Sequence, residues 1–251
     1  MLPSFHSWLN SGVIYKFYHA IFKNKSTIFH SMELKSIKND IPEELYEILK
    51  KEITNLRPAQ EKSVKKGLLE GKNLLVCTPT ASGKTLIAEL AALKSIIEGK
   101  GKAVYIVPLK ALASEKCRDF KKRYDKVAKT ALSIGEIDSA DPYLADYDLI
   151  VTTSEKFDSL IRHHAPWLSS IATVVVDEIH LLNDTERGPT LEILLTILKQ
   201  LLKKSQIIGL SATIGNAEEL AEWLNADLIV DEWRPVKLHK GVYLDGKIEF
   251  Y

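Results

Sequence analysis

The segment from Cys77 to Thr85, Cys-Thr-Pro-Thr-Ala-Ser-Gly-Lys-Thr, constrains the fold of this chain more than any other stretch. The apolar residues 73–77 predict a short buried strand, and the Leu- and Ala-rich residues 86–94 favour a helix. A tight turn of small residues between a strand and a helix can close backbone N–H groups around phosphate oxygens, at the positive end of the helix. The segment therefore predicts a phosphate-binding loop made of Thr78, Pro79, Thr80, Ala81, Ser82, Gly83, Lys84 and Thr85.

Two side chains at the end of this loop carry its chemistry. The Lys84 ammonium can reach the terminal phosphates of a nucleotide, and the Thr85 hydroxyl can ligate a magnesium ion. The loop departs from the pattern G-x-x-x-x-G-K-[ST], because Thr78 stands where the pattern has its first glycine. An ordinary strand-to-helix turn with a solvated lysine is the alternative interpretation.

Composition places the chain among globular domains and limits its partners. A chain of 251 residues, 45% of them hydrophobic, suggests one or two domains with one large core. The net charge is only +1, so any nucleic-acid site must be local. The two cysteines, Cys77 and Cys117, have neither metal-binding nor disulfide spacing, and we expect them to be small core residues in a reducing cytoplasm.

The first 31 residues differ from the rest, since they contain no Asp or Glu and are rich in aromatic residues. Their apolar run, residues 13–22, is shorter than the roughly 20 residues that a membrane span needs. A weak interfacial anchor is the alternative. Because Met32 begins a sequence of ordinary composition, we expect residues 1–31 to be a disordered or non-native extension, residues 32–251 to be the folded domain, and no membrane partner.

From residue 40 onward, apolar strands alternate with helices. A helix is expected from a cap at Asp40 with an apolar stripe through Ile53, and a second one from the break at 56–60 to near Gly71. Further strands are expected at 103–107, 130–134, 149–153, 173–177, 206–210 and 227–230, with helices at 109–124, 155–162, 189–203 and 217–224. This alternation predicts an α/β fold, with a mostly parallel sheet covered by helices on both faces.

The strand at 173–177 ends in two adjacent acids, Asp177 and Glu178. After a phosphate loop, this order predicts that Asp177 holds magnesium opposite Thr85 and that Glu178 orients and deprotonates an attacking water. Together with Lys84, these side chains supply the positioning and charge neutralisation that phosphoryl transfer requires. Taken alone, an Asp-Glu pair at a strand end is also common in surface turns.

Several segments resemble the motifs of superfamily 2 helicases, in the same order along the chain. They are Pro79–Thr85, Val107–Lys116, Thr152–Lys156, Asp177–His180 and Leu210–Thr213. Residues 186–192 and 216–224 are similar, more narrowly, to archaeal superkiller-type DNA helicases related to the polymerase-theta helicase domain. The resemblance covers about residues 42–251. It implies the first RecA-like P-loop NTPase domain of an ATP-dependent helicase that translocates on and unwinds DNA.

The resemblance also implies roles for individual residues. Gln60 is similar to the glutamine that reads adenine, and its amide has the donor and acceptor that this needs, although a solvated Gln60 is the alternative. The residues expected to couple the state of bound ATP and Mg²⁺ to domain movement are His180, Ser211, Ala212 and Thr213. The residues expected to touch the nucleic-acid backbone are Pro108, Lys110, Thr152, Thr153, Ser154 and Arg187.

Single-stranded or forked DNA and a second RecA-like domain are the partners that the resemblance implies. Since no second domain precedes Tyr251, we expect slow ATP turnover without the arginine of that domain. An RNA-acting helicase and a nucleic-acid- or partner-binding domain with weak ATPase activity are the alternatives. The basic run 110–129 is compatible with nucleic-acid contact or with a solvated helix face. Arg57 replaces an aromatic residue of the family, and Trp233 is expected to pack rather than to stack on a base.

Overall fold

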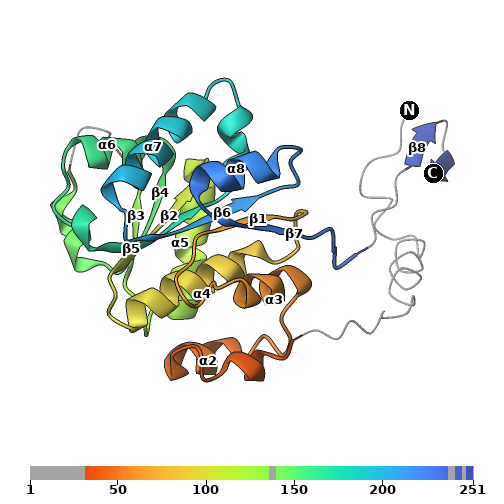
Figure 1. Cartoon of the computed structure of the whole chain (residues 1–251), viewed down its shortest axis with the longest axis horizontal. Helices are drawn as coiled ribbons and strands as arrows, with labels where there is room; N and C mark the ends of the chain where they lie inside the picture. Colours follow the sequence, from red (N-terminus) through yellow and green to blue (C-terminus); the bar gives the residue numbers. More distant parts are fainter. Residues whose placement is uncertain (1–31, 136–139, 237–240, 245–246, 251) are drawn as a thin grey trace, which may run out of the picture. The chain divides into compact units, whose positions relative to one another are not determined.

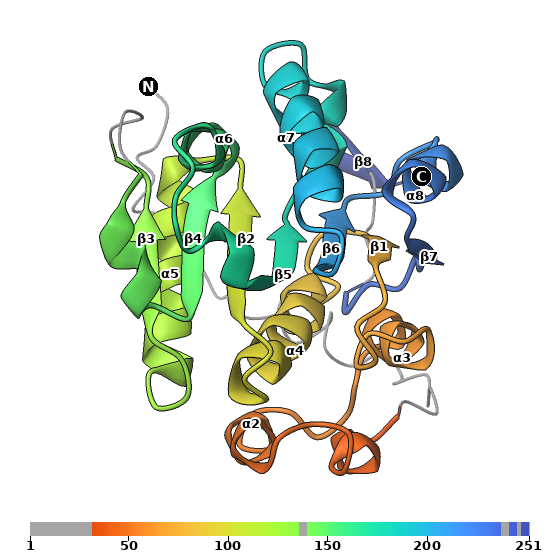
Figure 2. The ribbon, with the colours of Figure 1, turned by 60° about the vertical axis from the view of Figure 1, so that its left-hand side comes forward.

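A seven-stranded sheet forms the centre of the computed structural model, which describes residues 32–135, 140–236, 241–244 and 247–250. All its neighbouring strands pair in parallel, in the order β3-β4-β2-β5-β6-β1-β7, and Figure 2 shows them side by side. The strands are β1 (Leu74–Cys77), β2 (Lys102–Val107), β3 (Thr130–Ser133), β4 (Leu149–Thr153), β5 (Ile171–Val176), β6 (Gln206–Ser211) and β7 (Asp227–Val230).

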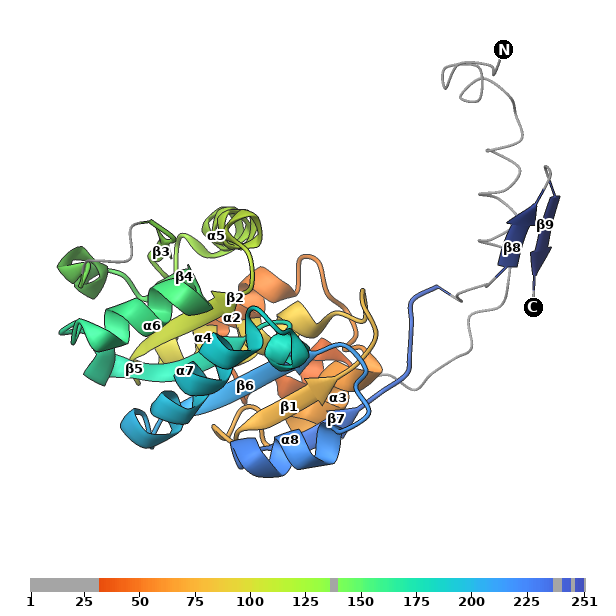
Figure 3. The same cartoon turned by 90° about the horizontal axis from the view of Figure 1, so that it is seen from above.

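Helices connect these strands and cover both faces of the sheet (Figures 1 and 3). The α-helices are α2 (Glu43–Leu49), α3 (Pro58–Lys65), α4 (Lys84–Ile97), α5 (Lys110–Tyr124), α6 (Ser154–Arg162), α7 (Gly188–Leu201) and α8 (Ala217–Leu224). Short 3₁₀ helices lie between them: η2 (Leu34–Ile37), η3 (Pro142–Asp146), η4 (Leu168–Ser170) and η5 (Ile179–Asn183).

The core consists of two apolar layers, one on each face of the sheet. Along β2, Tyr105 and Val107 pack with residues of α2, α3, α4 and α5, whereas Val104 and Ile106 pack with residues of α6, α7 and α8. This alternation follows from the strand backbone, which sends successive side chains to opposite faces. Because both faces are covered, the central strands are apolar throughout, and the fold class predicted from the sequence is confirmed.

Most predicted elements lie where they were expected, but three expectations near element ends were wrong. The first helix begins at Glu43 after Pro42, not at a cap on Asp40, because a residue that precedes proline is disfavoured in helical conformation, and it ends at Leu49 rather than reaching Ile53. The next helix ends at Lys65, since Gly67 adopts a φ of 99° and the chain turns there. Leu109 is 42% exposed instead of belonging to the buried face, because its backbone is extended just before α5.

The remaining features complete the described structure. Cys77 and Cys117 are buried free thiols, as expected. Strands β8 (Gly241–Leu244) and β9 (Lys247–Phe250) form an antiparallel hairpin that the sequence analysis did not predict. Within the described residues, no helix is both long enough and apolar enough to span a membrane. The extension of residues 1–31 lies outside the described residues, so its disorder stays a prediction.

Candidate nucleotide-binding cleft

The predicted phosphate loop is a closed turn between β1 and α4. Gly83 has a φ of 92°, and Ala81 has a φ of 63°, so the backbone turns through the left-handed region twice. The hydroxyls of Thr78 and Ser82 lie 2.7 Å apart across the loop, and both side chains are buried. Helix α4 starts directly behind at Lys84, so its first N–H groups face the loop.

Lys84 lies inside the loop rather than in solvent. Its Nζ donates a hydrogen bond to the carbonyl oxygen of Thr78, 2.9 Å away. Partial burial lowers the pKa of Lys84 from its ordinary value, and the nearby carboxylates of Glu178 and Asp177 counteract this shift. The ammonium group is therefore held beside two acids that come from a distant part of the sequence.

The start of α3 is tied to the phosphate loop through Gln60. This side chain is 4% exposed, so it is buried rather than solvated. Its Oε1 accepts a hydrogen bond from the backbone N–H of Arg57, and its Nε2 donates one to the carbonyl of Gly83, both at 2.8 Å. Arg57 donates from Nη1 to the carbonyl of Ala81, also at 2.8 Å. Loop and helix therefore hold each other in place.

The Arg57 guanidinium lies over the ring of Trp233, 5.6 Å from its centroid. Trp233 follows β7 and is half-buried. The residue that replaces the family's aromatic side chain is thus itself stacked on an aromatic ring. The contact with Arg57 is compatible with the expected packing role of Trp233, which stays a prediction.

Asp177 and Glu178 follow β5 at the same edge of the sheet. The backbone N–H of Asp177 donates to the carbonyl of Ile106 at 2.8 Å, which extends the pairing of β5 with β2. Both carboxylate oxygens of Asp177 accept hydrogen bonds, Oδ2 from the Tyr105 hydroxyl at 2.8 Å and Oδ1 from the N–H of Glu178 at 3.0 Å. Glu178 has a φ of 53°, so the chain turns away immediately after the pair.

One cleft of about 380 Å³ brings these residues together. It is lined by Arg57, Thr80, Ala81, Ser82, Gly83, Lys84, Thr85, Val107, Leu112, Glu115, Lys116, Asp177 and Glu178. A second pocket of about 340 Å³ shares Arg57, Gly83 and Thr85 with it and continues past Gln60. The two pockets give a continuous surface from the acids, along the phosphate loop, to Gln60.

The residues expected to couple nucleotide state to movement lie next to the cleft. The His180 Nδ1 atom lies 3.3 Å from Oε2 of Glu178 and 3.4 Å from the backbone nitrogen of Ala212. The carbonyl of Ser211, at the end of β6, accepts a hydrogen bond from the N–H of Thr78 at 3.2 Å. Thr213 is exposed. Both contacts use the same ring nitrogen, which either accepts from Ala212 or donates to Glu178, so His180 lies between Glu178 and the loop that follows β6.

The residues expected to contact nucleic acid divide into four that line a depression or lie at the surface and two threonines whose side chains are already hydrogen-bonded. Pro108, Ser154 and Arg187 line one small depression, which they share with Asp177 and Glu178. Lys110 is exposed at the first residue of α5.

The Thr152 and Thr153 side chains are buried and already bonded. Thr152 donates to the carbonyl of Ser133 at 2.7 Å, and the Thr153 hydroxyl accepts from the N–H of Lys156 at the start of α6. Through these bonds the two threonines hold the end of β4 and the start of α6, where Ser154 lies.

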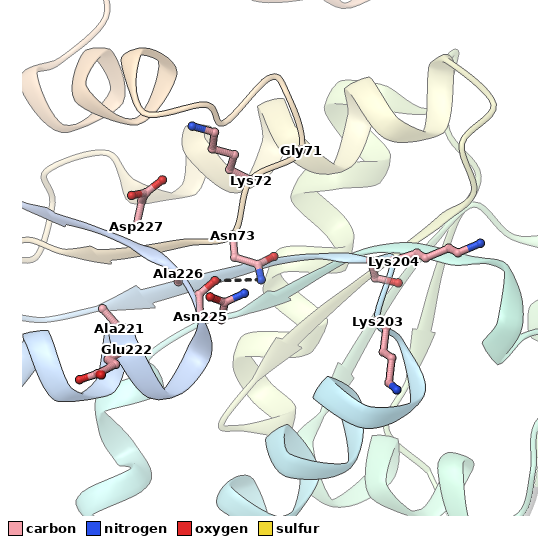
Figure 4. A pocket seen from close by; sticks show the side chains of 11 residues that line it. Gly71, Lys72, Asn73, Lys203, Lys204, Ala221, Glu222, Asn225, Ala226 and Asp227 are labelled. Atoms are coloured by element: carbon pink, nitrogen blue, oxygen red, sulfur yellow. Dashed lines mark hydrogen bonds between the residues drawn. The ribbon is translucent and has the colours of Figure 1, made fainter.

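A wider depression of about 510 Å³ lies at the opposite edge, where β1, β6 and β7 begin (Figure 4). The Asn73 side chain donates to the carbonyl of Asn225 there, at 3.2 Å. Lys72, Lys203 and Lys204 are exposed around this depression. The sequence analysis did not predict it, and none of the predicted site residues lines it.

The sequence analysis missed two side chains that bond the cleft residues Asp177 and Thr85. Tyr105 is a fully buried member of an apolar strand, and nothing in its sequence context shows that its hydroxyl meets Asp177. Lys116 is the last residue of the helicase-like segment Val107–Lys116, and its Nζ donates to the Thr85 hydroxyl at 3.0 Å. Its place in that segment is a signal that could have marked it.

The parallel sheet, its strand order and a phosphate loop at the carboxyl ends of the strands define a RecA-like α/β domain. The family model for DEAD/DEAH box helicases matches residues 57–220. The chain therefore belongs to the DEAD/DEAH box helicase family.

Three curated relatives indicate a narrower group within this family, because each of them is named ATP-dependent DNA helicase Hel308. The protein of Pyrococcus abyssi is 54% identical over 208 residues, which are 82% of this chain and 29% of the relative. The proteins of Methanocaldococcus jannaschii and Thermococcus kodakarensis are 55% and 50% identical, over 83% and 84% of this chain and 18% and 19% of their own lengths. The chain thus spans less than a third of the length of these relatives.

Proposed function

We propose that residues 32–251 are the first RecA-like domain of an ATP-dependent helicase that translocates on DNA and unwinds it. The observation that carries this proposal is that Lys84, Thr85, Asp177 and Glu178 line one cleft at the carboxyl edge of the sheet. They are the four side chains that ATP hydrolysis by a P-loop enzyme needs, and their chain order is that of the family.

ATP lies along the surface that joins the two pockets of this edge. Its phosphates take hydrogen bonds from the backbone N–H groups of Gly83, Lys84 and Thr85 at the start of α4 and charge neutralisation from the Lys84 side chain. Its base meets Gln60 at the other end, where the second amide hydrogen and the second lone pair of Oε1 offer a donor and an acceptor to adenine. The Arg57 guanidinium, supported from behind by Trp233, offers a flat face beside the base.

Magnesium is the metal that this donor set fits. The Thr85 hydroxyl and the Asp177 carboxylate are hard oxygen donors in one cleft, whereas the described residues contain no group of three His, Cys, Asp or Glu side chains able to hold a metal ion. Mg²⁺ is usually held by one or two protein oxygens together with substrate phosphates. Thr85 and Asp177 would hold it, and it would neutralise charge on the phosphates.

Glu178 is the residue that orients and deprotonates the attacking water. Its carboxylate lies at the mouth of the same cleft, and His180 joins it to the backbone of Ala212. Because one nitrogen of His180 serves either Glu178 or Ala212, a change at Glu178 on hydrolysis would alter whether His180 bonds the loop of Ser211–Thr213. Transition-state charge is neutralised further by an arginine of a second RecA-like domain, a contribution worth roughly 10³–10⁵ in rate.

DNA is the substrate that the relatives favour, since they are named DNA helicases. The DNA backbone would contact Pro108, Lys110, Ser154 and Arg187 on this domain. Thr152 and Thr153 would hold the end of β4 and the start of α6 in place for these contacts. Phosphate contacts of this kind position a strand but do not distinguish DNA from RNA. RNA is therefore the alternative substrate of the same site.

The Lys84→Ala variant tests the nucleotide site. It removes the ammonium group from the phosphates without touching the apolar core, so the affinity for a fluorescent ATP analogue should fall at least about a hundredfold. Circular dichroism melting should be unchanged within a few degrees. The matched control is Lys203→Ala, an exposed lysine at the opposite edge, which should bind like the unmodified chain. Equal affinity in the Lys84 variant would refute the proposed phosphate site.

A further inference from the structure

Lys116 is a lysine of α5 that turns toward the cleft, while its basic neighbours on the helix face solvent. Arg118, Lys121 and Lys122 are exposed, whereas Lys116 is half-buried and lines the cleft. Its Nζ donates a hydrogen bond of 3.0 Å to the hydroxyl oxygen of Thr85. Among the described residues, Lys116 forms no ion pair with a carboxylate. Its direct polar contact is thus with the loop residue at the start of α4.

A second contact places the same ammonium group over the ring of Tyr105, which bonds Asp177. The Lys116 Nζ lies over the ring of Tyr105, 5.9 Å from the centroid. Tyr105 is fully buried, and its hydroxyl donates to Oδ2 of Asp177 at 2.8 Å. The positive charge of Lys116 therefore lies against Thr85 directly and over the ring of Tyr105, whose hydroxyl bonds Asp177. These are the two side chains that we propose as metal ligands.

We infer that Lys116 holds the cation position beside Thr85 until Mg²⁺ arrives with the nucleotide and displaces it. The inference rests on the proposed function. The ammonium takes one of the two lone pairs of the Thr85 oxygen and holds a positive charge against it, so it repels a metal ion at the same oxygen and the two cations compete. Lys116 is therefore a positioning residue that keeps the Thr85 hydroxyl aimed into the cleft.

The displacement has a consequence for α5. Lys116 lies about 9 Å along this helix from Lys110, at a rise of about 1.5 Å per residue, and Lys110 is a proposed contact for DNA phosphate. While Lys116 is bonded to Thr85, it ties α5 to the start of α4. Arg123 and Tyr124 still bond Glu89 of α4, but they lie at the other end of α5, so release of the Lys116 bond affects the end that carries Lys110. Metal-nucleotide binding and DNA binding are therefore linked, and the linkage acts equally in both directions.

The Lys116→Met variant tests whether the ammonium group competes with the metal ion, because methionine keeps most of the side-chain length and removes the charge. The probe is Mn²⁺, whose binding to the chain in the presence of saturating ADP is measured by electron paramagnetic resonance. Without the competing ammonium, Mn²⁺ should bind about threefold to tenfold more tightly, the range expected for one hydrogen bond of ordinary net strength. Lys121→Met is the matched control, because it removes an exposed charge from the same helix and should leave Mn²⁺ affinity unchanged.

The alternative role for Lys116 is a direct hold on the nucleotide phosphates, and it gives the opposite result. In that case Lys116→Met would weaken binding of ADP with Mn²⁺, and weaker or unchanged Mn²⁺ affinity overturns the inference. Lys116→Gln serves as a second variant and should change Mn²⁺ affinity in the same direction, so a folding defect in one of them does not decide the outcome. Absence of ADP binding to the unmodified chain would instead overturn the proposed function itself.

A second readout tests the link to α5. The affinity for a fluorescent single-stranded DNA is measured with and without Mg²⁺ and a non-hydrolysable ATP analogue. In the unmodified chain the two conditions should differ severalfold, and Lys116→Met should bring the ratio close to one. Lys121→Met should lower the affinity in both conditions by a similar factor and preserve the ratio. A ratio that is unchanged in Lys116→Met overturns the link.

Discussion

The two edges of the sheet each carry a depression, and they differ in how their polar groups are held. The amino edge has the larger one, about 510 Å³ against about 380 Å³ for the cleft at the carboxyl edge. Around the amino edge, Lys203 and Lys204 extend into solvent. At the carboxyl edge, Lys84 is partly buried and bonded within its own loop, and Asp177 accepts two hydrogen bonds.

This difference shows that the volume of a depression does not indicate which edge of the sheet holds the candidate nucleotide site. In a parallel sheet with helices on both faces, the helices that follow the strands point their N-terminal N–H groups at the carboxyl edge. The amino edge receives helix C-termini and short turns, so nothing there favours an anion except flexible lysines. Three predictions test whether the two edges are as different in function as in structure.

The Gly83→Val substitution should have the largest effect. Gly83 has a φ of 92°, and a Cβ there would lie 2.6 Å from Nε2 of Gln60 and 3.0 Å from Cδ of Arg57. A branched residue must strain this backbone and displace Gln60, so we expect a loss of about 2 to 3 kcal/mol in the free energy of unfolding. The affinity for a fluorescent ATP analogue should fall at least about tenfold.

Gly71→Ala at the amino edge is the matched control for this prediction. Gly71 also has a positive φ, 84°, but a Cβ there meets nothing within 4 Å. It should cost about 1 kcal/mol in urea unfolding, from backbone strain alone, and leave nucleotide affinity unchanged. If Gly71→Ala weakened nucleotide binding as much as Gly83→Val, the contrast between the edges would be wrong.

The Asn73→Ala substitution should have an intermediate effect, on stability alone. The Asn73 side chain accepts from the N–H of Ile207 at 2.8 Å and donates to the carbonyl of Asn225 at 3.2 Å. Its loss leaves the Ile207 N–H without a partner at the start of β6, which should cost about 1 to 2 kcal/mol in urea unfolding. Asn73→Asp keeps the acceptor and should cost less. A large loss of nucleotide affinity in either variant would contradict the proposed division between the edges.

The smallest effect should come from the double variant Lys203→Ala and Lys204→Ala. Both side chains are exposed and neither makes an ion pair within the described residues. We expect the free energy of unfolding to change by no more than about 0.5 kcal/mol and the salt dependence of DNA binding to stay the same. A clearly shallower salt dependence would show that the amino edge also binds the strand.

The order of helices and strands was predictable because each strand is a short apolar run between polar segments. The strands at 149–153 and 227–230 and the helix at 217–224 have the predicted bounds. The errors fall at element ends, where single residues decide. Pro42 prevents Asp40 from capping the first helix, and Gly67 ends the second one early.

The phosphate-loop residues and the acid pair were also predictable, since both depend on local spacing within a motif. Lys84 with Thr85, and Asp177 with Glu178, lie in one cleft as their motifs predict. The hydrogen-bond partner of each of these side chains could not be predicted from the motifs. The Tyr105 hydroxyl meets Asp177 only because β2 pairs with β5, a pairing between segments far apart along the chain.

The sequence by itself determined the α/β fold class, the position of the phosphate loop and the acids that face it. These depend on hydrophobic periodicity and on short motifs, which are local properties of the chain. The tertiary structure alone decided that Gln60 is bonded to Gly83, that His180 accepts a hydrogen bond from Ala212, and that Lys116 lies against Thr85. Each of these contacts joins separate elements, and the distance between two such elements is set by strand order and packing, which no local pattern encodes.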